Sequence, residues 1–150
     1  MTAGPALQRV LAGEHAAIYV YGVIGGRLSF ASHAALANRV SAAYTTHRAR
    51  RDRLEAMIRA AGRTPVAAEV SYQLPNPCRT TAQLTAAARV VEDRCAAGYA
   101  DLVAATTGGQ RAWAVGALTD AAVRELGVGG TPTAYPGAPD LRTNRPPAIG

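Results

Sequence analysis

Four ionisable residues lie near the middles of four separate stretches that favour helix: Glu14, His47, Glu92 and Asp120. Apolar residues recur around them at spacings of three and four, the period at which helical side chains share one face. Charged groups are costly to bury in a helical bundle unless they pair with one another or bind a metal ion. The pattern therefore predicts four helices that enclose a small ionisable cluster.

The composition favours an all-α domain. Hydrophobic residues make up 49% of the 150-residue chain, but aromatic residues make up only 5%, and much of the remainder is alanine. Alanine is the strongest helix former, and Val and Ile are too sparse for a large sheet. A chain of this length can build one core without disulfides. We therefore expect one all-α domain with closely spaced helices.

The helices are expected at residues 5–26 (or 5–28), 33–61, 81–106 and 110–126. Gly62 and Gly127 are typical of residues that follow a helix, and Thr80 or Thr81 can cap the third one. The first helix carries Glu14 in its apolar line, and the second carries His47. We therefore expect both side chains to point inward.

The segment 63–80 contains three prolines, which exclude a regular helix. At about 3.3 Å per residue it can span roughly 60 Å, whereas a helix of about 28 residues is roughly 42 Å long. The segment can therefore travel the whole length of the bundle. We predict a long crossover between the second and third helices.

The fourth helix has two candidate inner faces. One combines an aromatic residue with polar residues: Trp113, Ala117, Asp120 and Arg124. The other is more apolar: Val115, Leu118, Ala122 and Leu126. Only the first face would direct Asp120 inward, so the sequence leaves its orientation open.

We divide the chain into a helical domain, residues 1–127, and a Pro/Gly-rich C-terminal tail, residues 128–150. The composition of the tail argues against an independent fold. Tyr135, Leu141 and Ile149 are its candidate anchors on the bundle.

The net charge of +6 favours anionic partners, and all 16 basic residues are arginine. Four of them gather at Arg48, Arg50, Arg51 and Arg53. No nucleic-acid recognition motif accompanies the charge, so we do not expect nucleic acid as the partner. An anion-binding role for this cluster stays a separate hypothesis. The Arg- and Ala-rich usage is typical of GC-rich bacterial genomes.

The sequence is also typical of a cytoplasmic protein. Cys78 and Cys95 are expected to be free thiols, as in a reducing compartment. The first residues lack the pattern of a secretion signal, and no apolar run is long enough to cross a membrane.

Three stretches resemble the ferritin-like superfamily, and more narrowly a bacterial family of ferritin-like domains with no assigned function: GEHAAIYVYGVIGGRL, HRARRDRLEAMIRAAG and RAWAVGALTDAAVREL. The linker sequence YQLPNP also fits, and the resemblance covers about residues 5–127. It implies a four-helix ferritin-like bundle with a crossover between helices two and three.

The resemblance also implies a ligand set, because the di-iron members use a Glu from two helices and a Glu-x-x-His pair from two others. Glu14, Glu92 and His47 match three of these positions, and Asp120 matches a fourth with a shorter carboxylate. The other two positions hold Tyr44 and Val123, which departs from the pattern. The chain thus keeps at most four of the six ligand positions, which makes its metal-site residues a degenerate version of the di-iron set.

Two interpretations of the cluster remain open at this point. Glu14, His47, Glu92 and Asp120 could hold a divalent ion such as iron, manganese or zinc. Alternatively, the carboxylates could pair with Arg51 or Arg124 and with His47, which would satisfy every buried group without a metal. We expect a non-catalytic domain that acts by association, with a metal-binding oxidoreductase or metal-storage protein as the alternative. The small residues Ala16, Ala17, Ala34 and Ala35 are compatible with a homodimer.

Overall fold

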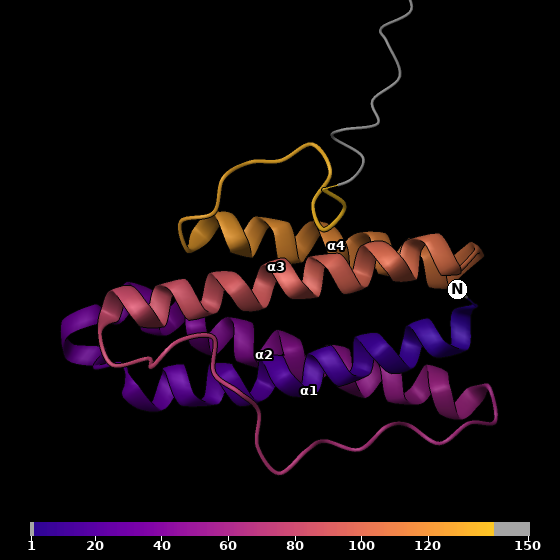
Figure 1. The fold of residues 1–150 in the computed structure, drawn as a ribbon, viewed down its shortest axis with the longest axis horizontal. Helices are drawn as coiled ribbons and strands as arrows, with labels where there is room; N and C mark the ends of the chain where they lie inside the picture. The colour runs from indigo at the N-terminus through magenta and orange to yellow at the C-terminus, as the bar shows by residue number, and fades with distance from the viewer. Residues whose placement is uncertain (1, 140–150) are drawn as a thin grey trace, which may run out of the picture.

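The computed structural model of the protein describes residues 2–139, and this part of the chain contains helices and no strands. The four helices are α1 (Ala3–Arg27), α2 (Phe30–Ala60), α3 (Thr81–Ala105) and α4 (Gly108–Gly127). They lie side by side as a four-helix bundle (Figure 1). The predicted all-α fold is confirmed.

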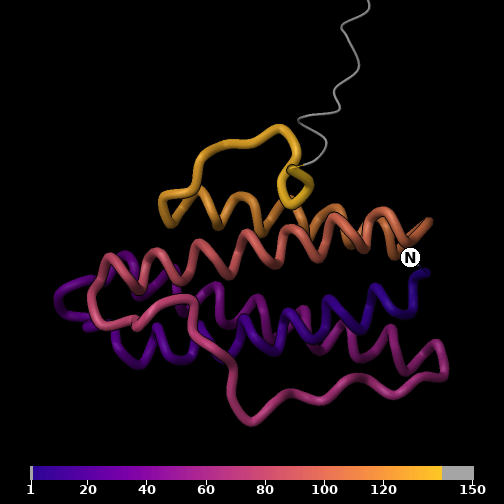
Figure 2. The backbone as a smooth tube through the Cα atoms, viewed as in Figure 1, coloured from indigo at the N-terminus to yellow at the C-terminus, as the bar shows by residue number. Residues whose placement is uncertain are grey.

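The chain crosses the length of the bundle between α2 and α3. Figure 2 shows α1 and α2 as one antiparallel pair and α3 and α4 as another, with the crossover returning along the outside of α1. Because of this return, α2 and α3 run in the same direction. Helix α1 packs against both α2 and α3, and α3 packs against α4.

The crossover is fastened to α1 by side chains. The Gln8 amide donates to the carbonyl of Thr64 at 2.7 Å and accepts from the N–H of Val66 at 2.8 Å. Further along, Arg27 donates to the carbonyl of Pro77 at 2.8 Å. These bonds satisfy backbone groups that the prolines keep out of regular structure.

Three helix starts differ from the sequence prediction, and α1 begins two residues early, at Ala3. Helix α2 begins at Phe30, before a kink at His33, where φ is −140° and ψ is 43°. Helix α4 begins at Gly108, so Gly108 and Gly109 belong to the helix rather than to a turn. Gly108 has a φ of +55°, a left-handed value that glycine adopts easily, and this allows the sharp change of direction after α3.

Helix α4 packs through alanine. Ala114, Ala117 and Ala121 are buried, whereas Val115 and Leu126 are 45% and 43% exposed. The more apolar of the two predicted faces therefore points outward. The reason is spatial: alanines allow α4 to approach α3 closely, where branched side chains would separate the helices.

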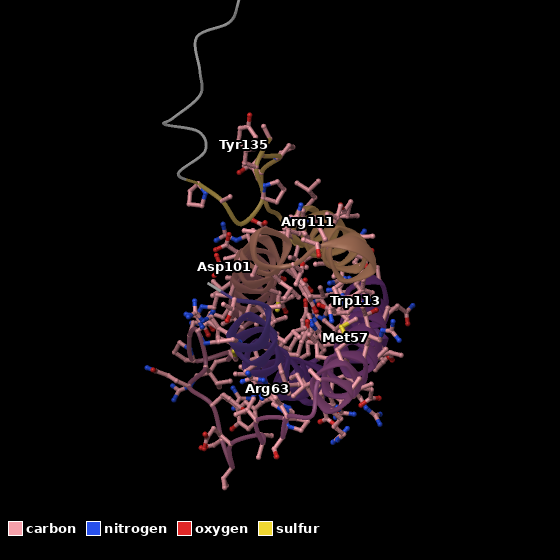
Figure 3. All side chains as sticks on the ribbon, turned by 90° about the vertical axis from the view of Figure 1, so that its right-hand side faces the viewer. Met57, Arg63, Asp101, Arg111, Trp113 and Tyr135 are labelled. Carbon is pink, nitrogen blue, oxygen red and sulfur yellow. The ribbon has the colours of Figure 1, made fainter. Side chains whose placement is uncertain are left out.

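Arginine side chains join α2 to α4. Arg50 donates to the carbonyl of Ala117 at 3.0 Å, and Arg39 donates to the carbonyl of Gly127. The end-on view shows side chains filling the space that the four helices surround (Figure 3). Part of the α2–α4 contact is thus made by long polar side chains rather than by close helix packing.

The described part of the tail folds back over the bundle. Gly137 has a φ of +69°, and a Cβ atom there would lie 2.3 Å from the backbone of Ala96 on α3. Only glycine can approach the helix this closely. Tyr135 lies on the outer side of the bundle (Figure 3) and is 40% exposed. The other two proposed anchors, Leu141 and Ile149, lie outside the described residues.

No helix in residues 2–139 is long and apolar enough to cross a membrane.

The alanine packing of α4 leads to a stability prediction. Ala121 is fully buried, so Ala121→Leu should overpack the α3–α4 contact and lower the free energy of unfolding by about 1–3 kcal/mol. Ala112→Leu on the exposed side of α4 serves as the control and should change it by less than about 0.5 kcal/mol. Urea denaturation monitored by circular dichroism measures both. Equal effects at the two positions would contradict the observed orientation of α4.

Candidate functional site

Three of the four ionisable residues singled out in the sequence meet in the core. Glu14 on α1, His47 on α2 and Glu92 on α3 have exposed fractions of 1%, 0% and 0%. The Nδ1 atom of His47 lies 2.6 Å from Oε2 of Glu14, and its Nε2 atom lies 3.2 Å from Oε1 of Glu92. The imidazole therefore bridges two carboxylates from different helices.

Two tyrosines complete the hydrogen bonding of these carboxylates. The Tyr99 hydroxyl donates to Oε1 of Glu14 at 2.5 Å, and the Tyr21 hydroxyl donates to Oε1 of Glu92 at 2.6 Å. The Tyr21 ring also stacks on the imidazole of His47, with ring centroids 5.1 Å apart. Both oxygens of Glu14 and both nitrogens of His47 thus have partners.

Two arginines carry the network toward α4. Nε of Arg124 donates to Oε1 of Glu92 at 2.9 Å. Arg50 is 6% exposed, and its guanidinium carbon lies 5.1 Å from the centroid of the Tyr99 ring. Both arginines donate to Oδ2 of Asp120, at 2.8 Å from Arg50 and 3.1 Å from Arg124.

Asp120 lies at the edge of this network rather than at its centre. Its side chain is 60% exposed, and its contacts are with arginines instead of with His47. The position follows from the alanine packing of α4, which turns the helix so that Ala117 and Ala121 face the core. The carboxylate of Asp120 therefore balances the charge of Arg50 and Arg124.

Cys95 joins the site from α3, and the sequence analysis did not assign it a role. One ligand atom each from Glu14, His47 and Cys95 lie within 4.8 Å of one another, and all three residues are buried. Glu92 and Cys95 are three residues apart, the same spacing as in a Glu-x-x-His pair. That spacing is the signal from which Cys95 could have been found.

Three buried polar atoms of the network lack a hydrogen-bond partner: Oε2 of Glu92, NH1 of Arg50 and NH2 of Arg124. Buried polar atoms of this kind are uncommon and call for an explanation. Here the oxygen of Glu92 is the one with a lone pair available for a further ligand. The Glu92 carboxylate can therefore accept a further hydrogen bond, or bind a cation, through its Oε2 atom.

Comparisons with known proteins agree with one another. Residues 6–140 match the family described as "Domain of unknown function (DUF4439)". The chain belongs to the DUF4439 family. Its structure is similar to the crystal structure of a conserved hypothetical protein, rv2844, from Mycobacterium tuberculosis, with 32% sequence identity and a TM-score of 0.78. That similarity covers 84% of this chain and 93% of the mycobacterial one. No curated protein matches the chain.

The ionic contacts of this DUF4439 protein shift the pKa values of its buried groups. Burial alone would lower the pKa of His47, but the hydrogen bonds with Cys95, Glu14 and Glu92 together outweigh it and raise that pKa well above 6.5. Burial alone would raise the pKa of Glu92, but His47 and Arg124 lower it to about 2. An imidazolium between two carboxylates is the expected state of the site at neutral pH.

The thiol of Cys95 and the hydroxyls of Tyr99 and Tyr21 stay in their neutral forms. Burial is the main cause that raises the pKa of Cys95, and the charge of Glu14 adds to it. Burial and then Glu14 likewise raise the pKa of Tyr99. Burial also raises the pKa of Tyr21, and Glu92 adds to that shift. The cysteine is therefore a thiol and the tyrosines are hydrogen-bond donors.

Two other residues considered in the sequence analysis lie elsewhere. Arg51 pairs with the neighbouring Asp52 at 2.7 Å, and Arg50 takes the buried position expected of Arg51. One residue along a helix corresponds to a rotation of about 100°, so a small error in register exchanges the two. His15 is 8% exposed, and its Nε2 atom lies 3.1 Å from the carbonyl oxygen of Val66 in the crossover.

The pKa shifts predict a pH-dependent stability. Because His47 has a raised pKa in the folded protein, its contribution is complete below about pH 6.5 and is lost as the pH rises through that pKa. Glu92 contributes above its ordinary value of 4.5, and this contribution is lost as the pH falls toward about 2. The metal-free protein should therefore have its highest melting temperature between about pH 4.5 and pH 6.5, with a decline as the pH rises above 6.5.

Differential scanning calorimetry in the presence of a chelator measures this decline. His47→Gln should have a lower melting temperature throughout, but one that changes little between pH 6.5 and pH 9. His33→Gln, at an exposed histidine, is the control and should behave as the unmodified protein. A decline that persists in His47→Gln would show that another group causes it.

Proposed function

We propose that this protein is a non-catalytic, ferritin-like bundle that binds one divalent transition-metal ion through Glu14, His47 and Cys95. The observation that carries the proposal is the meeting of an oxygen, a nitrogen and a sulfur ligand within 4.8 Å, each from a different helix. The fit of these residues to such an ion is supported by donor type and by charge, and a pocket adjoins the site.

The donor types favour a borderline or soft ion. Thiolate and imidazole ligands suit zinc and the neighbouring first-row metals, whereas magnesium and calcium prefer oxygen. Three protein ligands leave a fourth position of a tetrahedral zinc site. Glu92 lies outside the group of ligand atoms within 4.8 Å, so the fourth position would be left to a water molecule or another small ligand. Zinc is therefore the ion that we expect to bind best.

The net charge of the site does not change when one divalent ion replaces two protons. Without metal, Glu14, Glu92 and Asp120 balance a protonated His47, Arg50 and Arg124. A divalent ion brings two positive charges, while His47 loses its proton and Cys95 loses its thiol proton. The buried site therefore keeps zero net charge in both states, which avoids the large cost of an uncompensated charge in the core.

A pocket adjoins this site. It has a volume of about 300 Å³ and lies between α1 and α3, where Glu14, Cys95 and Tyr99 form part of its lining. Gly13 borders it, and a Cβ atom at this position would meet nothing within 4 Å. This space adjoins Glu14 and Cys95, which are themselves 1% and 7% exposed.

The ferritin-like resemblance bears on the number of ions. Of the six positions that hold ligands in di-iron members of that superfamily, this chain has Tyr44 and Val123 at two, and Val123 is 60% exposed. Two divalent ions would also lack sufficient carboxylates to balance them. The donor set supports one ion. A site for one ion fits binding or storage better than the oxidation carried out at two-ion sites.

Metal titration tests this proposal. Cobalt(II) added to the protein should give a 1:1 complex with an intense near-ultraviolet band from thiolate-to-cobalt charge transfer, and zinc should displace the cobalt. Cys95→Ala should abolish the band and weaken zinc binding at least tenfold. Cys78→Ala, at the other buried cysteine, is the matched control and should leave both unchanged.

Proton release provides a second measurement in the same experiment. Isothermal titration calorimetry in buffers of different ionisation enthalpy should show about two protons released per zinc ion near pH 7. The proposal is wrong if zinc binds with no band and no proton release, or if Cys95→Ala binds as tightly as the unmodified protein.

Association with a second copy of the chain is a second candidate function, favoured by the outer face of α4. Val115, Val123 and Leu126 expose 45%, 60% and 43% of their surfaces on this helix. Several large apolar residues on one helix face are typical of an interface rather than of a free surface. The homodimer expected from the sequence would then use α4 in addition to, or in place of, the small residues of α1 and α2.

Sedimentation equilibrium tests this association. The protein should show a monomer–dimer equilibrium, and Val123→Glu should shift it to the 15.5 kDa monomer. Val70→Glu, at a fully exposed valine of the crossover, is the control and should not change it. A monomer at all concentrations up to about 1 mM would remove this candidate.

A further inference from the structure

Helix α1 ends with three glycines that close helix packing does not require. Gly22, Gly25 and Gly26 lie within α1, where glycine is less favourable than alanine. A Cβ atom on Gly22 would lie 3.9 Å from the Tyr44 ring, and one on Gly25 would lie 3.7 Å from Val40. A Cβ atom on Gly26 would meet nothing within 4 Å. These are ordinary contact distances, so an alanine would fit at each of the three positions.

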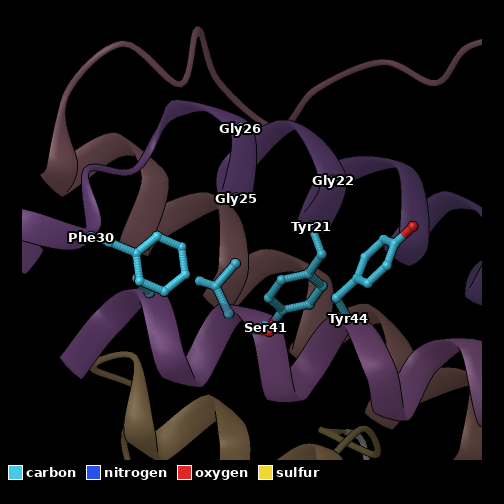
Figure 4. Close-up of a pocket in the computed structure, with 9 residues that line it drawn as sticks. Tyr21, Gly22, Gly25, Gly26, Phe30, Ser41 and Tyr44 are labelled. Atoms are coloured by element: carbon cyan, nitrogen blue, oxygen red, sulfur yellow. The ribbon is translucent and has the colours of Figure 1, made fainter. Parts of the chain in front are cut away.

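The glycines leave a pocket between α1 and α2 (Figure 4). Its volume of about 380 Å³ lies within the range of small-molecule sites. Its lining contains no charged residue and consists of Tyr21, Gly22, Gly25, Gly26, Phe30, Ala37, Val40, Ser41 and Tyr44. Larger side chains at the glycine positions would occupy this space.

Three aromatic rings line the pocket. Figure 4 shows the rings of Phe30, Tyr21 and Tyr44 in a row between α1 and α2, with Tyr21 coming from α1 and the other two from α2. Phe30, the one phenylalanine of the chain, is 59% exposed. It lies in the first turn of α2, before the kink at His33. A bound molecule would cover part of this exposed ring.

The Tyr21 ring is held in place before any ligand binds. Its hydroxyl donates to Glu92 at 2.6 Å, and the ring stacks on His47 with an interplanar angle of 27°. The residue is only 2% exposed. The ring therefore forms a fixed part of the pocket wall, and the more exposed rings of Phe30 and Tyr44 are the ones that a ligand can cover.

We propose that this pocket is a binding site for a small, neutral, flat aromatic molecule of one or two rings. Aromatic rings prefer offset-stacked or edge-to-face contacts with other rings, which Phe30, Tyr21 and Tyr44 supply. The uncharged lining selects against ionised ligands, because no group would compensate their charge. Ser41 and Tyr44 carry the hydroxyls that can bond to one polar substituent. This proposal does not depend on metal binding at Cys95.

Fluorescence titration with 6-propionyl-2-(dimethylamino)naphthalene, a neutral dye with one flat two-ring system, tests the site. The dye should bind saturably with a 1:1 stoichiometry, and 2-naphthol should displace it while 1-decanol should not. Gly25→Leu should fill the pocket and weaken dye binding at least tenfold. Phe30→Ala, at an exposed residue, should weaken it several-fold without lowering the melting temperature.

Gly116→Leu is the matched control, because it also places a leucine at a helical glycine with free space around its Cβ. This variant should bind the dye as the unmodified protein does. The proposal is overturned if the dye does not bind saturably, or if Gly25→Leu, shown to be folded by circular dichroism, binds it with unchanged affinity. Displacement by 1-decanol as effective as that by 2-naphthol would overturn the aromatic class of the ligand.

Discussion

The hydrogen-bonded contact of His47 with Glu14 and Glu92 is the interaction on which the interior of this bundle depends. A carboxylate, an imidazole and a second carboxylate come from three helices and are shielded from water almost completely. None of the three could be buried alone without a large penalty, so each requires the other two. The contact therefore fixes the rotation of α1, α2 and α3 relative to one another more strictly than their alanine-rich packing does.

The rest of the polar interior follows from that contact. Glu92 accepts from Tyr21 and Arg124, and through Arg124 and Arg50 the network reaches the exposed Asp120 on α4. This network of hydrogen bonds joins the α1–α2 pair to the α3–α4 pair. It does so between α2 and α4, where arginine side chains make the contact and the helices do not pack closely. The same arrangement places a thiol and a partnerless carboxylate oxygen beside the imidazole, which is why one network supports both a metal-free ion cluster and our proposed zinc site.

Much of the fold could be predicted from the sequence because local chemistry determines it. Prolines exclude helix from the crossover, and a period of three and four residues identifies the inward positions of Glu14 and His47. The same pattern could not separate Arg50 from Arg51, because one residue of register rotates a side chain by about 100°. The apolar pattern alone did not single out Cys95, since a buried cysteine looks like any small hydrophobic residue, although its spacing of three residues from Glu92 was the available signal. The orientation of α4 depends on how closely two helices approach, which hydrophobicity alone does not encode.

The protonation state of His47 tests this account most directly. Nitrogen-15 NMR of the metal-free protein labelled at histidine reports whether one or both ring nitrogens carry a proton. The account predicts that His47 is an imidazolium at pH 7, with both nitrogens protonated, and that one equivalent of zinc converts it to the neutral, metal-bound form. A His47 ring that is neutral at pH 7 without metal, and titrates near 6.5 as an exposed histidine does, would contradict it.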